Sequence, residues 1–212
     1  MRKNDILALI LPEVAGCPSA TAWVAVLRAA QELCRASGVW REWLDEILLL
    51  DGIAEYELEP SDGGVIDMVK EIWVGTRELH GKSHSEINWL MPDWRTSRST
   101  EPVYFNVDGP RNTVTVYPTP ASPIGSLRVR VQLVPSLSAT SIPDDVYTFY
   151  GEAIEKGAKG KLMMQRGTQW YEPKLGAVFA DEFNIAVNDA RIEEMAGQVP
   201  SSTRVQPRLF GS

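Results

Sequence analysis

The residues with the clearest potential for chemistry are His80 and His84, the two histidines of the chain. Histidines four residues apart on a helix can bind one metal ion, because they project from the same face. Gly81 and Ser83 give this stretch the composition of a loop, and no cysteine or carboxylate completes an obvious ligand set. We therefore interpret both histidines as solvent-exposed, and we expect no metal or other cofactor.

The run Gly157-Ala158-Lys159-Gly160-Lys161 superficially resembles a phosphate-binding loop. Such a loop needs a glycine five residues before its Gly-Lys pair and a serine or threonine after the lysine. Glu155 and Leu162 occupy those positions here, so the match fails. The sequence contains no convincing catalytic constellation, and we predict that the protein is not an enzyme.

Three glycines, Gly151, Gly157 and Gly160, fall inside a predicted helix. Each costs about 1 kcal/mol relative to alanine in such a position. Small residues on one helix allow another helix to approach closely, which gives these glycines a reason to be there. The approaching helix belongs either to the same chain or to a neighbouring copy. We expect inter-subunit packing at Gly151, Gly157 and Gly160, with packing within the chain as the alternative.

These glycines belong to a predicted antiparallel helical hairpin in residues 142–197. Pro143 and Pro173 suit the first turn of a helix, and Gly167 and Gly197 suit the left-handed residue just past a helix end. The apolar residues recur at helical spacing. They are Val146, Phe149, Tyr150, Ala153, Ile154 and Leu162 in the first helix and Leu175, Val178, Phe179, Ala186, Val187 and Ala190 in the second.

Two more helices are predicted near the N-terminus, one over residues 4–14 and one from about Ser19 to Ser37, which Gly38 ends. The second has a clear core-facing stripe. The stripe consists of Trp23, Val26, Leu27, Ala30, Leu33 and Cys34. Two cysteines, Cys17 and Cys34, are too few for a disulfide framework, so we interpret them as small buried residues in a reducing compartment.

Residues 39–135 have the polar–apolar alternation of β-strands. The predicted strands cover residues 55–59, 65–74, 103–107, 113–117 and 127–133, with an apolar run at 46–50. The third and fourth of these form a hairpin around Asp108-Gly109-Pro110. Residues 80–100 are predicted to be an irregular surface excursion with one helical turn near residues 85–90.

Strands in one block with helices at both ends indicate an α+β fold. We predict a helical bundle made from N-terminal helices in residues 1–38 and the C-terminal antiparallel helical hairpin in residues 136–197. An antiparallel β-domain, residues 39–135, is inserted between them, and an extended C-terminal arm, residues 198–212, follows.

The chain has 212 residues, of which 44% are apolar and 23% charged, as in an ordinary soluble globular protein. Its net charge of −7 argues against a general nucleic-acid binder, which should carry a basic face. This charge is compatible with a protein that surrounds DNA without gripping it. No stretch is long enough to span a membrane, so we expect no membrane association.

The arm is rich in proline and serine and contains no acidic residue. A segment of this composition lacks the apolar surface to fold alone, so its ordering requires a surface on which to lie. We expect that surface to belong to a partner, with docking on the arm's own domain as the alternative. The residues expected at the partner interface are Val199, Arg204, Val205, Arg208, Leu209 and Phe210.

Several short motifs occur in an order that resembles the podophage head-to-tail connector (adaptor) proteins, which are related to the tail-tubular A proteins. The motifs are Leu11-Pro12-Glu13-Val14-Ala15-Gly16-Cys17-Pro18, Ala29-Ala30-Gln31-Glu32-Leu33-Cys34-Arg35 with Val39-Trp40, Glu101-Pro102-Val103-Tyr104-Phe105, Val116-Tyr117-Pro118-Thr119-Pro120, Leu127-Arg128-Val129, Tyr150-Gly151-Glu152-Ala153-Ile154 with Gly157-Ala158, and Trp170-Tyr171. The resemblance spans most of residues 6–195.

The resemblance implies a structural protein that forms a homo-oligomeric ring of twelve copies beneath the portal of the capsid. Such a ring extends the DNA channel, encloses double-stranded DNA without sequence specificity, and presents a platform for tail nozzle and tail fibre proteins. The family's C-terminal arm, here residues 198–212, reaches into the portal. The expected location is the neck or tail of the virion, and the host cytoplasm during assembly. An acidic channel wall would repel phosphates and let DNA slide.

Two other functions stay open at this point. Trp73, Trp89 and Trp94 could form a sugar-binding platform on a monomeric binding module, although aromatic residues in β-domains more often belong to the core. Saturable glycan binding by a monomer would favour that function. A hydrolase would depend on scattered acids such as Asp93 and Glu101, and neutralising them would have to abolish turnover.

Overall fold

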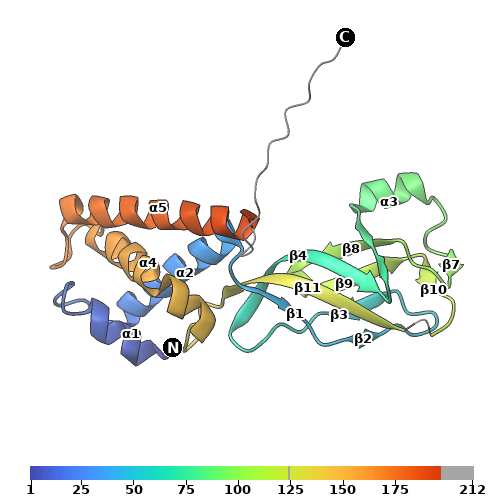
Figure 1. Ribbon diagram of the computed structural model, residues 1–212, viewed down its shortest axis with the longest axis horizontal. Coiled ribbons are helices and arrows are strands. Elements are labelled where there is room, and N and C mark those ends of the chain that lie inside the picture. The colour runs from blue at the N-terminus through green and yellow to red at the C-terminus, as the bar shows by residue number, and fades with distance from the viewer. Residues whose placement is uncertain (124, 197–212) are drawn as a thin grey trace, which may run out of the picture.

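The computed structural model describes residues 1–123 and 125–196, which form two lobes joined end to end (Figure 1). One lobe contains the long helices and the other contains the strands and a short helix. This arrangement confirms the predicted α+β class. Residues 198–212 lie outside the described residues, as does Gly197.

The helical lobe consists of α1 (Lys3–Ile10), α2 (Ser19–Ser37), α4 (Asp144–Met163) and α5 (Pro173–Ala196). The helices begin and end near the predicted punctuation. Pro173 is the first residue of α5, Pro143 directly precedes α4, and Gly38 ends α2 with a φ of +73°. The first helix is shorter than predicted, because the chain leaves helical geometry in a turn after Ile10.

The apolar stripe predicted for α2 is buried in its entirety and forms the centre of the helical lobe. Two of the apolar residues that recur at helical spacing in the hairpin do not face the core, since Phe149 is 74% exposed and Val178 is 50% exposed. These side chains stay exposed because the residues at the contact of α4 with α5 are small. Gly160 of α4 lies against the backbone of Gly176 and Ala180, so a narrow contact joins the helices and leaves apolar side chains outside.

The strand lobe contains three sheets. A five-stranded sheet has the order β1-β11-β4-β5 with β2 also paired to β11, a four-stranded sheet has the order β3-β9-β8-β6, and β7 pairs with β10. The strands are β1 (Arg41–Trp43), β2 (Ile47–Leu48), β3 (Glu55–Glu57), β4 (Gly64–Val74), β5 (Arg77–Glu78), β6 (His80–Gly81), β7 (Arg98–Ser99), β8 (Tyr104–Asp108), β9 (Thr113–Tyr117), β10 (Thr119–Pro120) and β11 (Ser126–Pro135). The pairings are antiparallel except for β6 with β8 and β10 with β7.

The longest strand pair, β4 with β11, is the backbone of the strand lobe. Alternate residues of β11, namely Leu127, Val129, Val131 and Leu133, are buried as the strict alternation predicted. The predicted hairpin is also present as β8 and β9, although a short 3-10 helix, Gly109–Arg111, replaces the simple turn. The excursion contains α3 (His84–Leu90), at the predicted helical turn.

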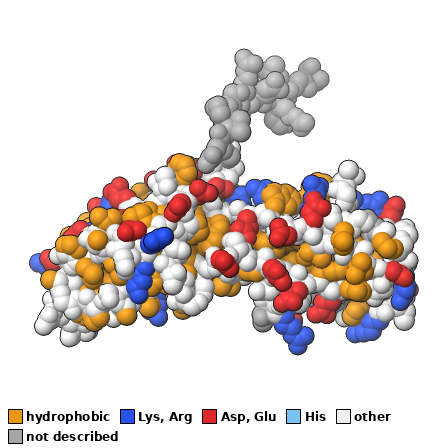
Figure 2. Space-filling view, turned by 90° about the horizontal axis from the view of Figure 1, so that it is seen from below, with side chains coloured by type: hydrophobic (Ala, Val, Ile, Leu, Met, Phe, Trp, Pro, Cys, Tyr) orange, Lys and Arg blue, Asp and Glu red, His pale blue; other side chains and the backbone are white. Residues whose placement is uncertain are grey.

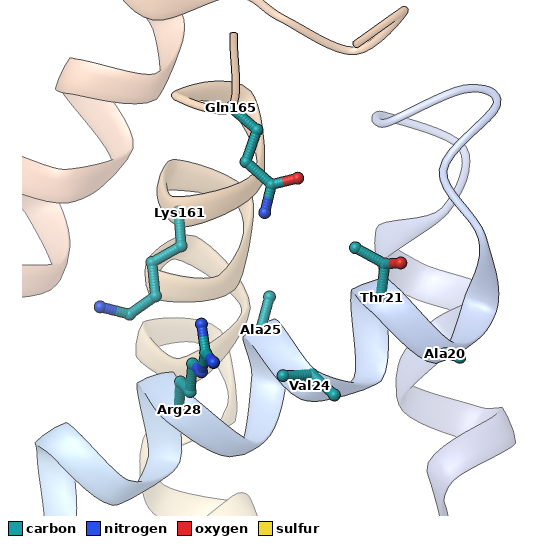
Figure 3. A pocket seen from close by; sticks show the side chains of 7 residues that line it. All are labelled: Ala20, Thr21, Val24, Ala25, Arg28, Lys161 and Gln165. Atoms are coloured by element: carbon teal, nitrogen blue, oxygen red, sulfur yellow. The ribbon is translucent and has the colours of Figure 1, made fainter. Parts of the chain in front are cut away.

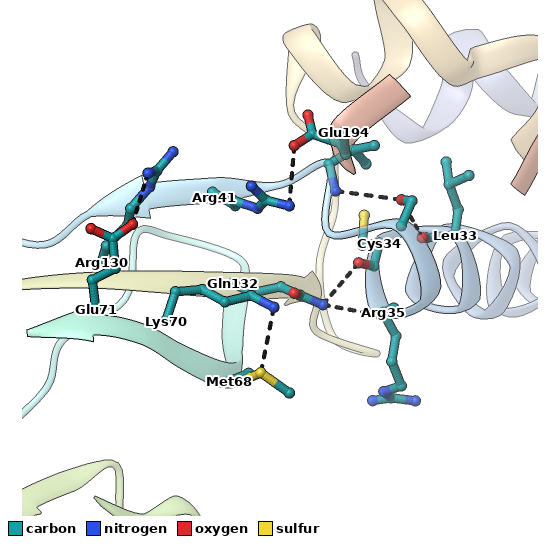
Figure 4. A network of polar contacts seen from close by, with 12 residues as sticks. Leu33, Cys34, Arg35, Arg41, Met68, Lys70, Glu71, Arg130, Gln132 and Glu194 are labelled. Carbon is teal, nitrogen blue, oxygen red and sulfur yellow. Dashed lines mark hydrogen bonds and ion pairs between the residues drawn. The ribbon is translucent and has the colours of Figure 1, made fainter. Parts of the chain in front are cut away.

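A buried glutamine joins the two lobes. Gln132 of β11 is 2% exposed, and its Nε2 donates hydrogen bonds to the backbone oxygens of Cys34 and Arg35, each at 3.1 Å (Figure 4). These oxygens belong to the last turn of α2, where carbonyls lack partners within the helix. The ion pair between Arg41 and Glu194 links β1 to α5 beside this joint, at 3.1 Å. The end of α2 is therefore fixed by the strand lobe.

We predict that Cys34 does not react with thiol reagents in the folded protein. Its side chain is fully buried, and burial, together with the nearby Asp67 carboxylate, raises the pKa of the thiol to about 12. Because the thiolate is the reactive form, neither access nor ionisation favours modification near neutral pH. Titration with a disulfide reagent before and after denaturation measures this difference. Modification of Cys34 at the same rate in both states would contradict the prediction.

Candidate interaction surfaces

The two histidines lie at the edge of the strand lobe, His80 on β6 and His84 at the first residue of α3. Both are exposed, as expected. Within residues 1–123 and 125–196, no group of three or more His, Cys, Asp or Glu residues could hold a metal ion. The same part of the chain contains no helix that is both long and apolar enough to cross a membrane.

The two lysines of the run from Gly157 to Lys161 make ion pairs that hold the helical lobe together. Lys159 lies 2.5 Å from Glu13 in the loop after α1, and Lys161 lies 2.5 Å from Glu32 of α2. Lys159 is itself buried. The run is therefore a structural part of α4, in agreement with its failure to match a phosphate-binding loop.

The start of α3 is fixed by a capping box. The backbone N–H and hydroxyl of Ser83 both donate to the Glu86 carboxylate, and the Ser83 hydroxyl accepts a hydrogen bond from the Glu86 N–H. These hydrogen bonds, with Lys82 nearby, lower the pKa of Glu86 to about 2. The excursion is thus an ordered projection of the strand lobe, and Trp89 on it is 80% exposed.

The other two tryptophans considered for sugar binding are engaged within the chain. Trp94 packs edge-on against Tyr117 at 5.3 Å, and the Arg95 guanidinium lies 4.2 Å from its ring centre. Trp73 is half-buried and donates from Nε1 to Glu71. Of the two suggested catalytic acids, Glu101 pairs with Arg77 at 2.8 Å, and Asp93 lies in the turns after α3.

The glycines of α4 are buried against this chain's own helices. A Cβ atom at Gly157 would lie 2.8 Å from Cδ2 of Phe183 and 3.0 Å from Cβ of Ala29, and one at Gly160 would lie 3.1 Å from the Ala180 nitrogen. Packing within the chain is therefore present at Gly157 and Gly160, while inter-subunit packing at these positions stays a prediction. At Gly151 the nearest group is the Tyr147 ring of the same helix, and a role between copies stays a prediction there.

The six arm residues expected at a partner interface, Val199, Arg204, Val205, Arg208, Leu209 and Phe210, lie outside the described residues. The described residues contain other surfaces that the sequence reasoning missed. The first is an apolar row along the outer side of α5. Val178, Ile185 and Ile192 follow one another at intervals of seven residues and are 50%, 61% and 64% exposed. Seven residues make nearly two full helical turns, so the three side chains form a continuous ridge.

An acidic groove flanks this ridge, between α5 and α4. Its walls include Phe149 and Lys156 of α4 and Glu182, Asp189 and Glu193 of α5. Lys156 is already paired with Glu182 at 3.0 Å and also with Glu152. The carboxylate of Glu193 raises the pKa of the half-buried Tyr150, after the larger effect of burial. This edge of α5 therefore has an excess of negative charge.

A second groove, between α2 and the C-terminal part of α4, has basic character (Figure 3). Its lining residues are Ala20, Thr21, Val24, Ala25 and Arg28 of α2 with Lys161 and Gln165 of α4. Arg28 and Lys161 extend from their helices across the same opening (Figure 3). Lys161 is paired with Glu32, whereas Arg28 makes no ion pair within residues 1–123 and 125–196. The groove thus offers small apolar side chains beside a cation.

The remaining surface is mixed. Seen from below, acidic side chains gather over the part of the strand lobe nearest the helices, among apolar and uncharged groups (Figure 2). The edge strand β3 also has two exposed acidic residues, Glu55 and Glu57. Charged residues on an edge strand discourage pairing with a strand of another molecule. This feature favours contacts between molecules through the helices rather than through the sheet edge.

Comparison with known proteins gives one family match that extends over both lobes. The model of a family described as the SU10 adaptor protein matches residues 8–206. No curated protein matches the chain.

Proposed function

Because the chain belongs to the SU10 adaptor protein family, a family of structural adaptor proteins of phages, we propose that it joins the portal of a phage capsid to the tail. The observation that supports this proposal is the extent of the match, since residues 8–206 include both lobes and the beginning of the arm. The chain resembles the family as a whole rather than through a single motif. A structural adaptor acts through its surfaces, and it is not an enzyme class.

In this proposal the protein forms a ring of copies, with twelve as the number that the resemblance to podophage connectors suggests. The arm, residues 198–212, contacts the portal, and the two-lobed body extends the DNA channel and supports tail nozzle and fibre proteins. The helices of residues 1–38 and 136–197 form a helical domain, and the strands of 39–135 form a β-domain inserted in it. The protein then resides in the virion at the neck, after assembly in the host cytoplasm.

The test is light scattering on gel-filtered mixtures of the protein with the portal protein of the same phage. The full chain is compared with a version that ends at Gly197. We expect the full chain to add to the portal as a stoichiometric ring and the shortened chain to stay free, because the arm supplies Leu209 and Phe210 as anchors. If both versions add, the arm is not the joint. If neither adds, docking to the portal is wrong.

A further inference from the structure

The ridge on α5 requires a partner whose surface is not acidic. A continuous patch of exposed apolar side chains is a candidate contact surface, and this row has Asp181, Asp189 and Glu193 along its sides. If two copies paired through the same ridge about a two-fold axis at Ile185, Val178 would meet Ile192 but Asp181 would meet Asp189. Like charges brought together in this way oppose association. A symmetric contact of α5 with α5 is therefore disfavoured.

The basic groove between α2 and α4 is concave and contains the cation Arg28, whereas the α5 ridge is convex and has acidic neighbours. The exposed row of α2 from Ala20 to Arg35 covers about 22 Å, and the ridge from Val178 to Ile192 covers about 21 Å, at about 1.5 Å per residue. Both surfaces combine apolar side chains with charge. The groove has Arg28, together with Lys161 paired to Glu32, and the ridge has the carboxylates of Asp181, Asp189 and Glu193 beside it. The two surfaces also lie on different sides of α4, because Lys156 and Lys161 project about 140° apart around that helix.

The order of side chains along the two helices gives a register. On α2, Val24 precedes Arg28 by four residues, and on α5, Ile185 precedes Asp189 by four residues. If the two helices lie parallel in this register, Ile185 faces Val24 and Asp189 faces Arg28. Glu193 then comes opposite Glu32, whose charge is already paired with Lys161. Within the part of the chain that the structure describes, neither Arg28 nor Asp189 makes an ion pair. Both charges are therefore available to a neighbour.

We propose that the α5 ridge of one copy docks in the α2–α4 groove of a second copy, with Ile185 against Val24 and Asp189 beside Arg28. The proposal rests on the proposed adaptor function, and it names the joint between neighbouring copies. Each copy offers two different surfaces, so the contact is heterologous and repeats from copy to copy. A repeated contact of this type closes into a ring when its rotation angle allows.

The first test reverses the two charges. Arg28→Glu and Asp189→Arg should each weaken the addition of one copy to the next by at least about tenfold, because each places like charges together. The variant carrying both changes should recover, as should an equimolar mixture of the single variants, in which every contact can join unlike charges. Exchange of Arg28 for Gln, which removes the charge without reversing it, should have a smaller effect. Circular dichroism of each isolated variant checks that the fold is retained.

Wild-type protein added to the portal separates this inference from the proposed function. If the wild type does not add, portal docking fails. If the wild type adds and both single charge reversals add equally well, the proposed joint is wrong while the adaptor function stands. Recovery in the mixture supports a heterologous contact, because a symmetric α5 contact would leave Arg28→Glu without effect.

The second test decides the joint whatever the portal result. Chains with Val24→Cys and chains with Ile185→Cys are mixed at high concentration, with and without portal, and treated with a short bis-maleimide. We expect dimers from the mixture and a ladder of oligomers from the doubly substituted chain. The wild type is the control, since Cys17 and Cys34 are buried. Dimers from Ile185→Cys alone, or the lack of any ladder, would overturn the proposal.

Discussion

Replacing Gly157 by leucine is expected to lower the free energy of unfolding of the isolated chain by about 3 kcal/mol, the upper end of what overpacking usually costs. A Cβ atom there already lies 2.8 Å from the Phe183 ring and 3.0 Å from the Ala29 side chain. These neighbours belong to α5 and α2, so a larger side chain must push apart three packed helices. Urea unfolding followed by circular dichroism measures the change.

The matched control is Thr148→Leu, which introduces the same side chain at an exposed position of α4. A surface substitution of this kind usually changes stability by less than about 0.5 kcal/mol. The comparison also separates the two explanations of the α4 glycines. If Gly157 served only a contact between copies, the leucine variant would keep its stability as an isolated chain and lose only assembly.

The sequence predicted the helices well where local signals agreed. Gly38 marked the end of α2 because only a residue that tolerates a positive φ fits there, and Pro173 marked the beginning of α5. The burial of the α2 stripe was predictable because helices and strands of the same chain surround most of this helix. In α5 the same periodicity included Val178, which is exposed, since spacing alone does not say which side the neighbouring helix takes.

The candidate surfaces were less predictable than the fold. The ridge had a signal, because Val178, Ile185 and Ile192 repeat every seven residues on a helix that already has a buried face. The basic groove had none, since Arg28 and Lys161 are far apart in sequence and only the packing of α2 on α4 brings them to one opening. The role of Gln132 was also hidden, because its position in the alternation of β11 suggests an exposed polar residue.

Trp23→Ala is expected to lower the free energy of unfolding by about 3–5 kcal/mol, as large aromatic truncations in a core do. Trp23 is buried in α2, and its Nε1 donates to the Ala139 oxygen at 2.8 Å, across 116 positions of sequence. The side chain therefore ties α2 to the segment that leaves the strand lobe and enters α4. Thermal and urea unfolding of the variant beside the wild type provide the measurement.

Trp23→Phe separates the two contributions of the side chain. Phenylalanine keeps most of the buried ring but leaves the Ala139 oxygen without its donor, which should cost about 1–3 kcal/mol. Since α2 is also held by Gln132 at its other end, we expect helices and strands to unfold in one transition in both variants. Separate transitions, or equal stability of Trp23→Ala and the wild type, would show that the contact of Trp23 with Ala139 does not couple the lobes. A coupled unit is what an adaptor needs, because a load applied to one lobe must then reach the other.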